Sequence, residues 1–302
     1  MNENQKARAA VLLGNFFFGT SVIAVKHISP SLIPPIALTA VRILVTTVLF
    51  WLMYAMRPVK MGITKKDILR LFFCAIAGIT LNQTFSMRGM SLASPIHASL
   101  LILTTPIVIT FLAAWFLKES LTTLKLVGLM LGIGGGALLV FSRDISVHGS
   151  GQESLGDLFV IMGAICYSVY VVSIKPLMEK YKAVHILQWV FLFGSFISLP
   201  LGWNALSQVS WLAFDSISWL ALAYIVLGAT FLAYQLMNYA ISKLGASITG
   251  SYIYTQPFFA TIASMLLLHE SLSLPKIAAA TLIITGVFLT NYNKVKTENQ
   301  GF

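Results

Sequence analysis

The chain has 302 residues, of which 57% are hydrophobic and only 10% are charged, and its mean hydropathy is +0.84. A soluble domain carries about 25% charged residues, so this composition excludes a water-soluble globular protein. The formal net charge of +10 is compatible with a nucleic-acid-binding protein, but the placement of the charges indicates a different origin.

Apolar runs of about 17–25 residues, each long enough to cross roughly 30 Å of hydrocarbon, follow one another along the chain. The ten predicted membrane-spanning helices are 9–28, 35–56, 68–88, 94–117, 123–142, 156–178, 184–203, 216–240, 246–268 and 274–293. The short connections leave no room for a soluble domain. The start of the chain lacks a small-x-small cleavage site before a polar segment, so we expect an uncleaved first helix.

The basic residues predict the orientation of these helices in the membrane. With the N-terminus in the cytoplasm, Lys26, Arg88, Arg143 and Lys276 fall outside, Arg42 lies within the second span, and all other Lys and Arg residues fall on the cytoplasmic side. This is the positive-inside pattern, so we expect the inner (cytoplasmic) cell membrane with both termini cytoplasmic. The basic excess then reflects orientation and contact with anionic lipid, and we expect no nucleic-acid partner.

The chain repeats itself at half its length. The phrase Glu-Ser-Leu-(Ser/Thr) occurs at 119–122 and 270–273, an offset of 151 that also aligns the Thr-x-Pro segments at 104–106 and 255–257. We therefore predict two five-helix copies, 1–147 and 148–302. Because each copy has an odd number of helices, the copies have opposite orientations, as in the inverted repeats of secondary transporters.

Three motifs resemble the EamA-type members of the drug/metabolite transporter superfamily. They are the first helix "GNFFFGTSVIAVK", the second helix "PPIALTAVRIL", and the pair "TTPIVITFLAAWFLKESLT" and "TQPFFATIASMLLLHESLS". The resemblance covers about residues 8–293. It implies ten helices, export or exchange of small metabolites such as amino acids, and a central cavity lined by the first, third, fourth, sixth, eighth and ninth helices.

Polar side chains at mid-span are the candidate substrate-binding residues, because polar groups in hydrocarbon need internal partners and should point inward. The set comprises Asn15, Asn82, Gln83, His97, Thr104, Tyr167, Tyr170, Tyr234, Asn238, Tyr252 and Gln256. Hydrogen bonding between helices is the alternative role for each of them. The concentration of the set on the helices that the resemblance assigns to the cavity favours substrate contact.

Five further residues are candidates for gating or hinge roles. Pro106 and Pro257 remove backbone hydrogen bonds within the predicted fourth and ninth helices, and each is either an architectural kink or a moving hinge. Glu119 and Glu270 stand between helices, where a carboxylate stabilises the start of the following helix or forms a gating ion pair with a lysine. Arg88 closes the third helix near the outer mouth, where it can attract a carboxylate.

Several conspicuous features have simpler interpretations. Arg42 is expected to snorkel outward or to cap a neighbouring helix end. "GIGGGA" at 132–137 matches a dinucleotide-binding pattern, but no strand precedes it, so we interpret these small residues as helix-packing positions. Cys74 and Cys166 are expected to be small packing residues rather than metal ligands or a disulfide. No cofactor and no metal are expected.

These features predict an all-α integral membrane protein that exports or facilitates the passage of small metabolites by alternating access. No fixed charge is expected at the cavity centre, which favours a neutral or zwitterionic solute such as an amino acid. The expected partners are this solute and the lipid bilayer, and the chain acts as a monomer or a homodimer. Absence of a mid-span carboxylate disfavours a carboxylate proton relay.

Two alternatives belong to other functional classes. An intramembrane enzyme or lipid-modifying protein needs paired carboxylates, a His-x-x-x-His motif or a Ser/His pair at membrane depth, and the sequence contains no such constellation. We therefore expect no enzymatic activity. A channel needs a selectivity ring, and an inverted repeat is more typical of a carrier.

Overall fold

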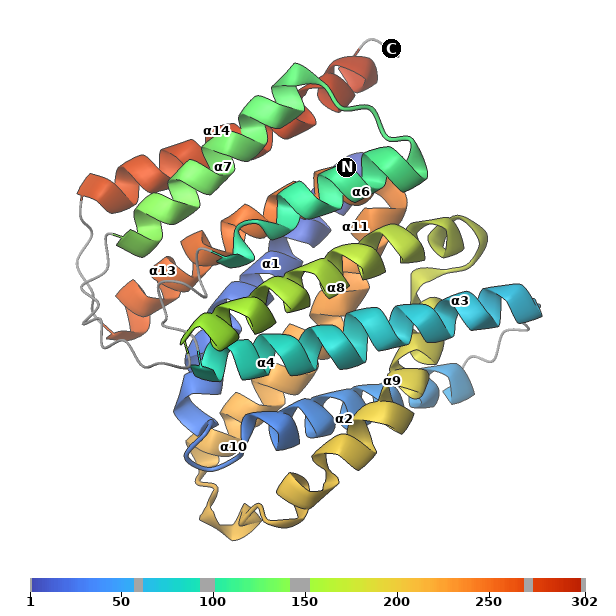
Figure 1. Cartoon of the computed structure of the whole chain (residues 1–302), viewed down its shortest axis with the longest axis vertical. Helices are drawn as coiled ribbons and strands as arrows, with labels where there is room; N and C mark the ends of the chain where they lie inside the picture. Colours follow the sequence, from blue (N-terminus) through green and yellow to red (C-terminus); the bar gives the residue numbers. More distant parts are fainter. Residues whose placement is uncertain (1, 57–61, 93–100, 142–152, 269–273, 300–302) are drawn as a thin grey trace.

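A computed structural model describes residues 2–56, 62–92, 101–141, 153–268 and 274–299, and every regular element in these ranges is helical (Figure 1). Six helical runs in the described part are long and apolar enough to span a membrane: Glu3–Val25, Pro35–Met56, Lys65–Gly89, Leu155–Lys180, Ala183–Ser207 and Ser216–Leu244. Three shorter apolar helices cover Thr105–Leu117, Thr123–Leu138 and Ile277–Thr290. The protein is therefore an all-α, multi-pass membrane protein.

Elements of the first half are α1 (Glu3–Ile28), α2 (Pro35–Met56), α3 (Lys65–Ala75), η1 (Ile76–Leu81), α4 (Asn82–Leu92), α6 (Thr105–Leu117) and α7 (Thr123–Phe141). Those of the second half are α8 (Glu153–Lys180), α9 (Ala183–Ser207), η2 (Trp211–Ala213), α10 (Ser216–Ala223), η3 (Tyr224–Leu232), α11 (Ala233–Leu244), α12 (Ala246–Ser251), η4 (Tyr252–Tyr254), α13 (Thr255–Leu268) and α14 (Leu274–Asn299). Both η1 and η3 are π-helical turns, and each joins its two neighbours into one run.

Side-chain caps fix the start of the helices α3 and α10. The hydroxyl of Thr64 accepts a hydrogen bond of 3.2 Å from the Asp67 amide, and Oδ1 of Asp215 accepts one of 2.8 Å from the Ser218 amide. Hydrogen bonds from Ser218 also lower the pKa of the Asp215 carboxyl, so this cap is ionised at neutral pH. Thr64 and Asp215 are separated by the repeat offset of 151, and both start a helix.

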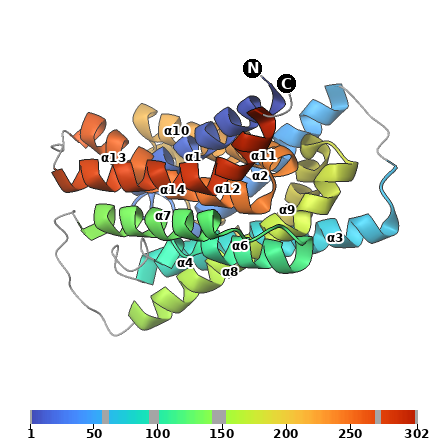
Figure 2. The same cartoon turned by 90° about the horizontal axis from the view of Figure 1, so that it is seen from above.

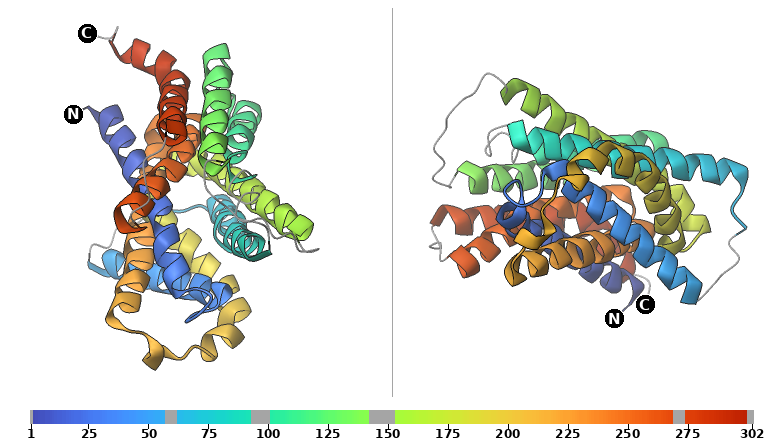
Figure 3. Two further views of the ribbon diagram at one scale, coloured as in Figure 1. Left: turned by 90° about the vertical axis from the view of Figure 1, so that its left-hand side faces the viewer. Right: turned by 90° about the horizontal axis from the view of Figure 1, so that it is seen from below.

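The helices pair across the two halves of the chain. α7 lies against α14 and α2 lies against α9, and in Figure 1 the members of each pair run in opposite directions. The view from above shows α7 and α14 side by side as well (Figure 2). This pair lies at one end of the longest axis, with α2, α9 and α10 at the other (Figure 3). The helices α1 and α8 lie between these ends, α1 against α11 and α13, and α8 against α4 and α6.

Pro106 and Pro257, the two predicted hinge prolines, stand at the first turn of a helix rather than in the middle of one. Pro106 is the second residue of α6, and Pro257 is the third residue of α13, which follows the 3-10 turn η4. A proline in a first turn removes no internal hydrogen bond. A turn at 103–104 precedes α6, and the 3-10 turn η4 precedes α13, so a new helix starts at each of these prolines. Thr104 and Thr255 each donate to the carbonyl three residues earlier, at 2.6 and 2.7 Å.

Candidate functional site

A cluster of buried polar side chains joins α4, α8 and α11 at the centre of the bundle. Nε2 of Gln83 donates to the hydroxyl of Tyr234 at 3.1 Å. Nδ2 of Asn238 donates to the hydroxyl of Tyr170 at 3.0 Å and to the carbonyl of Tyr234 at 2.8 Å. The ring of Tyr167 lies 6.0 Å from that of Tyr170. Five of the predicted substrate-binding residues therefore lie together, and they come from both halves of the chain.

A second group joins α1 to α13. Nε2 of Gln256 donates to Oδ1 of Asn15 at 2.8 Å, and Nδ2 of Asn15 donates to the carbonyl of Val11, also at 2.8 Å. Tyr252, in the 3-10 turn that precedes α13, is buried in an apolar cluster with residues of α1 and α11. Asn15 is completely buried, so this bond also lies inside the bundle.

The other members of the predicted set contact the backbone or lie outside the described residues. Nδ2 of Asn82 donates to the carbonyl of Gly163 at 2.9 Å, which joins α4 to α8. Thr104 donates to the carbonyl of its own turn. His97 and Glu270 fall outside the described residues. In this conformation the side-chain amides of the predicted set donate hydrogen bonds to other protein groups, which is the alternative role that the sequence left open. Substrate contact stays a prediction.

Glu119 caps a helix of the opposite half. Its carboxylate oxygens accept hydrogen bonds from the backbone amides of Ala246 at 2.9 Å and Ser247 at 3.2 Å, at the start of α12. At the start of the following helix, α7, the hydroxyl of Thr122 accepts the hydrogen bond from the Lys125 amide, while the Glu119 carboxylate bonds to α12. Nζ of Lys125 donates to the Ser120 carbonyl. Among the described residues no ion pair joins Glu119 to a lysine, and the gating role of Glu119 stays a prediction.

Arg42 neither snorkels outward nor caps a helix end, so both sequence-based expectations are wrong. Only 7% of the residue is exposed, and its Nε donates to the hydroxyl of Thr230 at 3.0 Å. Thr230 lies in the π-helical turn η3 and donates in turn to the carbonyl of Ile225. The signal that points to Thr230 is a repeated Gly-x-Thr, at 78–80 and 228–230, which falls in both π-helical turns.

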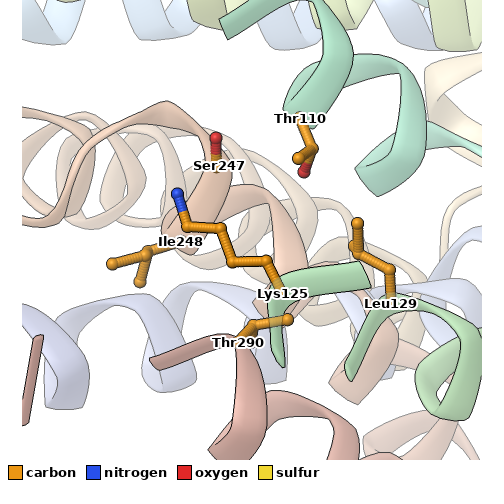
Figure 4. A pocket seen from close by; sticks show the side chains of 6 residues that line it. All are labelled: Thr110, Lys125, Leu129, Ser247, Ile248 and Thr290. Carbon is orange, nitrogen blue, oxygen red and sulfur yellow. The ribbon is translucent and has the colours of Figure 1, made fainter. Parts of the chain in front are cut away.

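Arg88, near the end of α4, has an exposed side chain, and its predicted role near a mouth of the path stays a prediction. A small pocket lies where α6, α7, α12 and α14 meet, next to the Glu119 cap (Figure 4). Its lining comprises Thr110, Lys125, Leu129, Ser247, Ile248 and Thr290. None of these belongs to the predicted substrate-binding set.

Helices that cross the membrane repeatedly and share buried polar groups between two halves define a polytopic membrane protein of the transporter type. The EamA-like transporter family matches residues 5–141 and, a second time, residues 154–292. The chain belongs to this family of membrane transporters, and the resemblance seen in its motifs is confirmed.

Two relatives of similar length carry transporter names, and a third is named a WAT1-related protein. The chain is 24% identical to the uncharacterized transporter YetK of Bacillus subtilis over 91% of its own length and 84% of that protein. It is 27% identical to an uncharacterized transporter of Synechocystis over 96% of this chain and 91% of the other. It is also 24% identical to a chloroplastic WAT1-related protein of Arabidopsis thaliana, over 93% and 69%.

A solved crystal structure has the same fold. The two superpose with a TM-score of 0.81 at 18% identity, and the match covers 97% of this chain and 99% of the other. At this identity the likeness concerns the fold alone.

Proposed function

We propose that the protein is a secondary transporter that exports small metabolites or facilitates their passage. Its solutes are neutral or zwitterionic, with amino acids as the leading class. Ten membrane spans form two inverted five-helix repeats, 1–147 and 148–302, which rock around a central site by alternating access. The chain acts without a cofactor, as a monomer or homodimer, in the inner cell membrane with both termini in the cytoplasm.

The pattern of helix contacts supports the inverted repeats. α1 contacts α11 and α13, while its counterpart α8 contacts α4 and α6, so the same contacts occur with the halves exchanged. The counterparts α2 and α9 contact each other, and so do α7 and α14. A two-fold axis between the halves produces this pattern. The opposite directions of the paired helices in Figure 1 support an axis in the membrane plane.

One hydrogen bond carries the proposal. Gln83 and Tyr234 are separated by 151 residues, the same offset that aligns Glu119 with Glu270, so they occupy equivalent positions in the two halves. A bond between equivalent positions lies on the axis that relates the halves. Both side chains are buried, at 6% and 4% exposure, among amide and phenol groups. Inverted-repeat transporters bind substrate at this place, near the midplane between the repeats.

Solute flux in reconstituted vesicles tests this proposal. We expect that vesicles containing the purified full-length chain take up at least one amino acid several-fold faster than empty vesicles. Measurement with and without a pH gradient will show whether protons drive this flux. If no amino acid or drug-like metabolite in a broad panel crosses faster than in empty vesicles, the proposed function is wrong.

A further inference from the structure

Arg42 brings a permanent charge into the bundle, and no carboxylate of the described residues forms an ion pair with it. It is the eighth residue of α2, about 10 Å along the helix from its start at Pro35. Ion pairs such as Lys175–Glu179, Lys180–Asp67 and Lys243–Glu3 do not involve Arg42. A buried charge without a counter-charge is strongly unfavourable, so an unpaired arginine at this place indicates a ligand of opposite charge.

The structure holds the guanidinium in a fixed orientation through one of its nitrogens. Nε donates to the hydroxyl of Thr230, which is completely buried and passes its own proton to the Ile225 carbonyl at 2.8 Å. π-helical turns such as η3 occur frequently at functional sites, because they free a carbonyl from the regular ladder. With Nε engaged, the two terminal nitrogens of Arg42 keep their hydrogens for another partner.

The side-chain hydrogen bond of Arg42 uses Nε alone, so within the described structure the terminal nitrogens keep donors for a further partner. Neither terminal nitrogen is a completely enclosed atom without a partner. The phenol of Tyr234 interacts electrostatically with Arg42 and accepts the hydrogen bond from Gln83. The guanidinium therefore adjoins the amide and phenol cluster on the axis between the halves.

We propose that Arg42 binds the carboxylate of the transported solute, which is therefore a zwitterion or a small organic anion rather than a neutral molecule. This inference rests on the proposed transport function. It changes the substrate class by excluding neutral solutes and adding small organic anions, and it replaces the expectation that no fixed charge lies near the cavity centre. A guanidinium presents two parallel N–H groups that match the two oxygens of a carboxylate. A phosphate dianion would favour a second cation beside Arg42, and no lysine or arginine of the described residues is hydrogen-bonded with it to a shared partner.

Ligand-induced thermal stabilisation of the full-length protein in detergent tests the carboxylate. The probes are matched pairs that differ in one group: L-alanine and L-alaninamide, L-phenylalanine and L-phenylalaninamide, benzoate and benzamide. We expect at least one carboxylate to raise the melting temperature while its carboxamide at the same concentration does not. If no carboxylate stabilises the wild type more than its carboxamide, the proposal is overturned.

Variants assign the effect to Arg42. We expect Arg42→Gln to weaken the apparent affinity for the stabilising carboxylate at least tenfold and Arg42→Lys, which keeps the charge without the two-pronged geometry, to weaken it less. Lys182→Gln, which removes an exposed positive charge, is the matched control and should leave the affinity unchanged. An Arg42→Gln protein that folds and keeps full discrimination contradicts the proposal. If Arg42→Gln does not fold, two measurements still test the proposal: the difference between carboxylate and carboxamide on the wild type, and the affinity of Arg42→Lys for the stabilising carboxylate. An Arg42→Lys protein with the wild-type affinity contradicts the proposal.

Binding and flux separate this inference from the transport function. If carboxylates stabilise the protein only when Arg42 is present, but no solute crosses the membrane, the binding site is supported and the proposed transport function is wrong. Flux that a carboxamide inhibits as strongly as its carboxylate would retain transport and overturn the role of Arg42.

Discussion

Replacing Gly128 by alanine is expected to lower the melting temperature of the detergent-solubilised protein by about 5 °C, because it forces α7 away from α14. A Cβ at Gly128 would lie 2.6 Å from the Gly286 carbonyl oxygen and 2.9 Å from the Thr290 amide nitrogen. These are backbone atoms, which cannot move aside as a side chain can. Overpacking of this kind costs about 1–3 kcal/mol, which corresponds to several degrees in a chain of this size.

The matched control lies six residues further along the same helix. A Cβ at Gly134 meets nothing within 4 Å, so Gly134→Ala introduces the same methyl group without a clash. We expect it to leave the melting temperature unchanged or to raise it slightly, because alanine restricts the unfolded chain. Equal effects of the two substitutions would contradict the close packing of α7 on α14.

A disulfide between α4 and α8 is expected to abolish solute flux reversibly. A Cβ at Gly163 would lie 2.7 Å from the Oγ of Ser86, near the separation of about 3 Å between a cysteine Cβ and its partner's sulfur in a disulfide. The cysteine pair Ser86→Cys and Gly163→Cys should therefore bond on oxidation. Because α4 and α8 belong to different halves of the chain, which are the two proposed repeats, the bond should prevent the proposed rocking motion and lower flux at least tenfold.

The native cysteines Cys74 and Cys166 are replaced by alanine in this experiment, so that only the engineered pair reacts. Each single variant, Ser86→Cys or Gly163→Cys, receives the same oxidant as a control and should keep its flux. Reduction with dithiothreitol should restore the flux of the double variant. A fully cross-linked protein that transports at the uncrosslinked rate would contradict relative motion of α4 and α8.

The helical fold could be predicted from the sequence because the lipid hydrocarbon restricts how a backbone can cross it. A backbone in lipid must satisfy its own hydrogen bonds, so each long apolar run predicts a helix. The helices α1, α2, α8 and α9 begin and end within a few residues of the predicted spans. Six of the runs meet the length and hydropathy of a membrane span in the described structure, and the ten-span count stays a prediction.

The local helix type could not be predicted in the same way. The π-helical turns η1 and η3 interrupt apolar runs whose composition does not change at those positions. Their positions depend on tertiary contacts, such as the hydrogen bond from Arg42 to Thr230. For the same reason the sequence did not reveal that Pro257 follows a 3-10 turn.

The sequence predicted which residues belong to the buried polar clusters, but not which hydrogen-bond partner each residue has. Asn15, Gln83, Tyr170, Tyr234 and Asn238 were identified because polar groups at mid-span must find partners inside the bundle. Which partner each one finds depends on contacts between residues far apart in the chain.

The partners of Arg42 and Glu119 could not be predicted for the same reason. These partners, Thr230 and the start of α12, lie in the other half of the chain. Hydropathy and spacing carry no information about contacts between the halves.

The central claim, that the second half repeats the first in the opposite orientation, is tested most directly by the accessibility of two equivalent positions. Lys65 and Ser216 are both exposed, start α3 and α10, and are separated by the repeat offset of 151. In a chain without Cys74 and Cys166, each is replaced by cysteine and treated with a membrane-impermeant maleimide in intact cells. We predict that Ser216→Cys is labelled at once and Lys65→Cys only after permeabilisation. Labelling of both positions from the same side would contradict the inverted repeat.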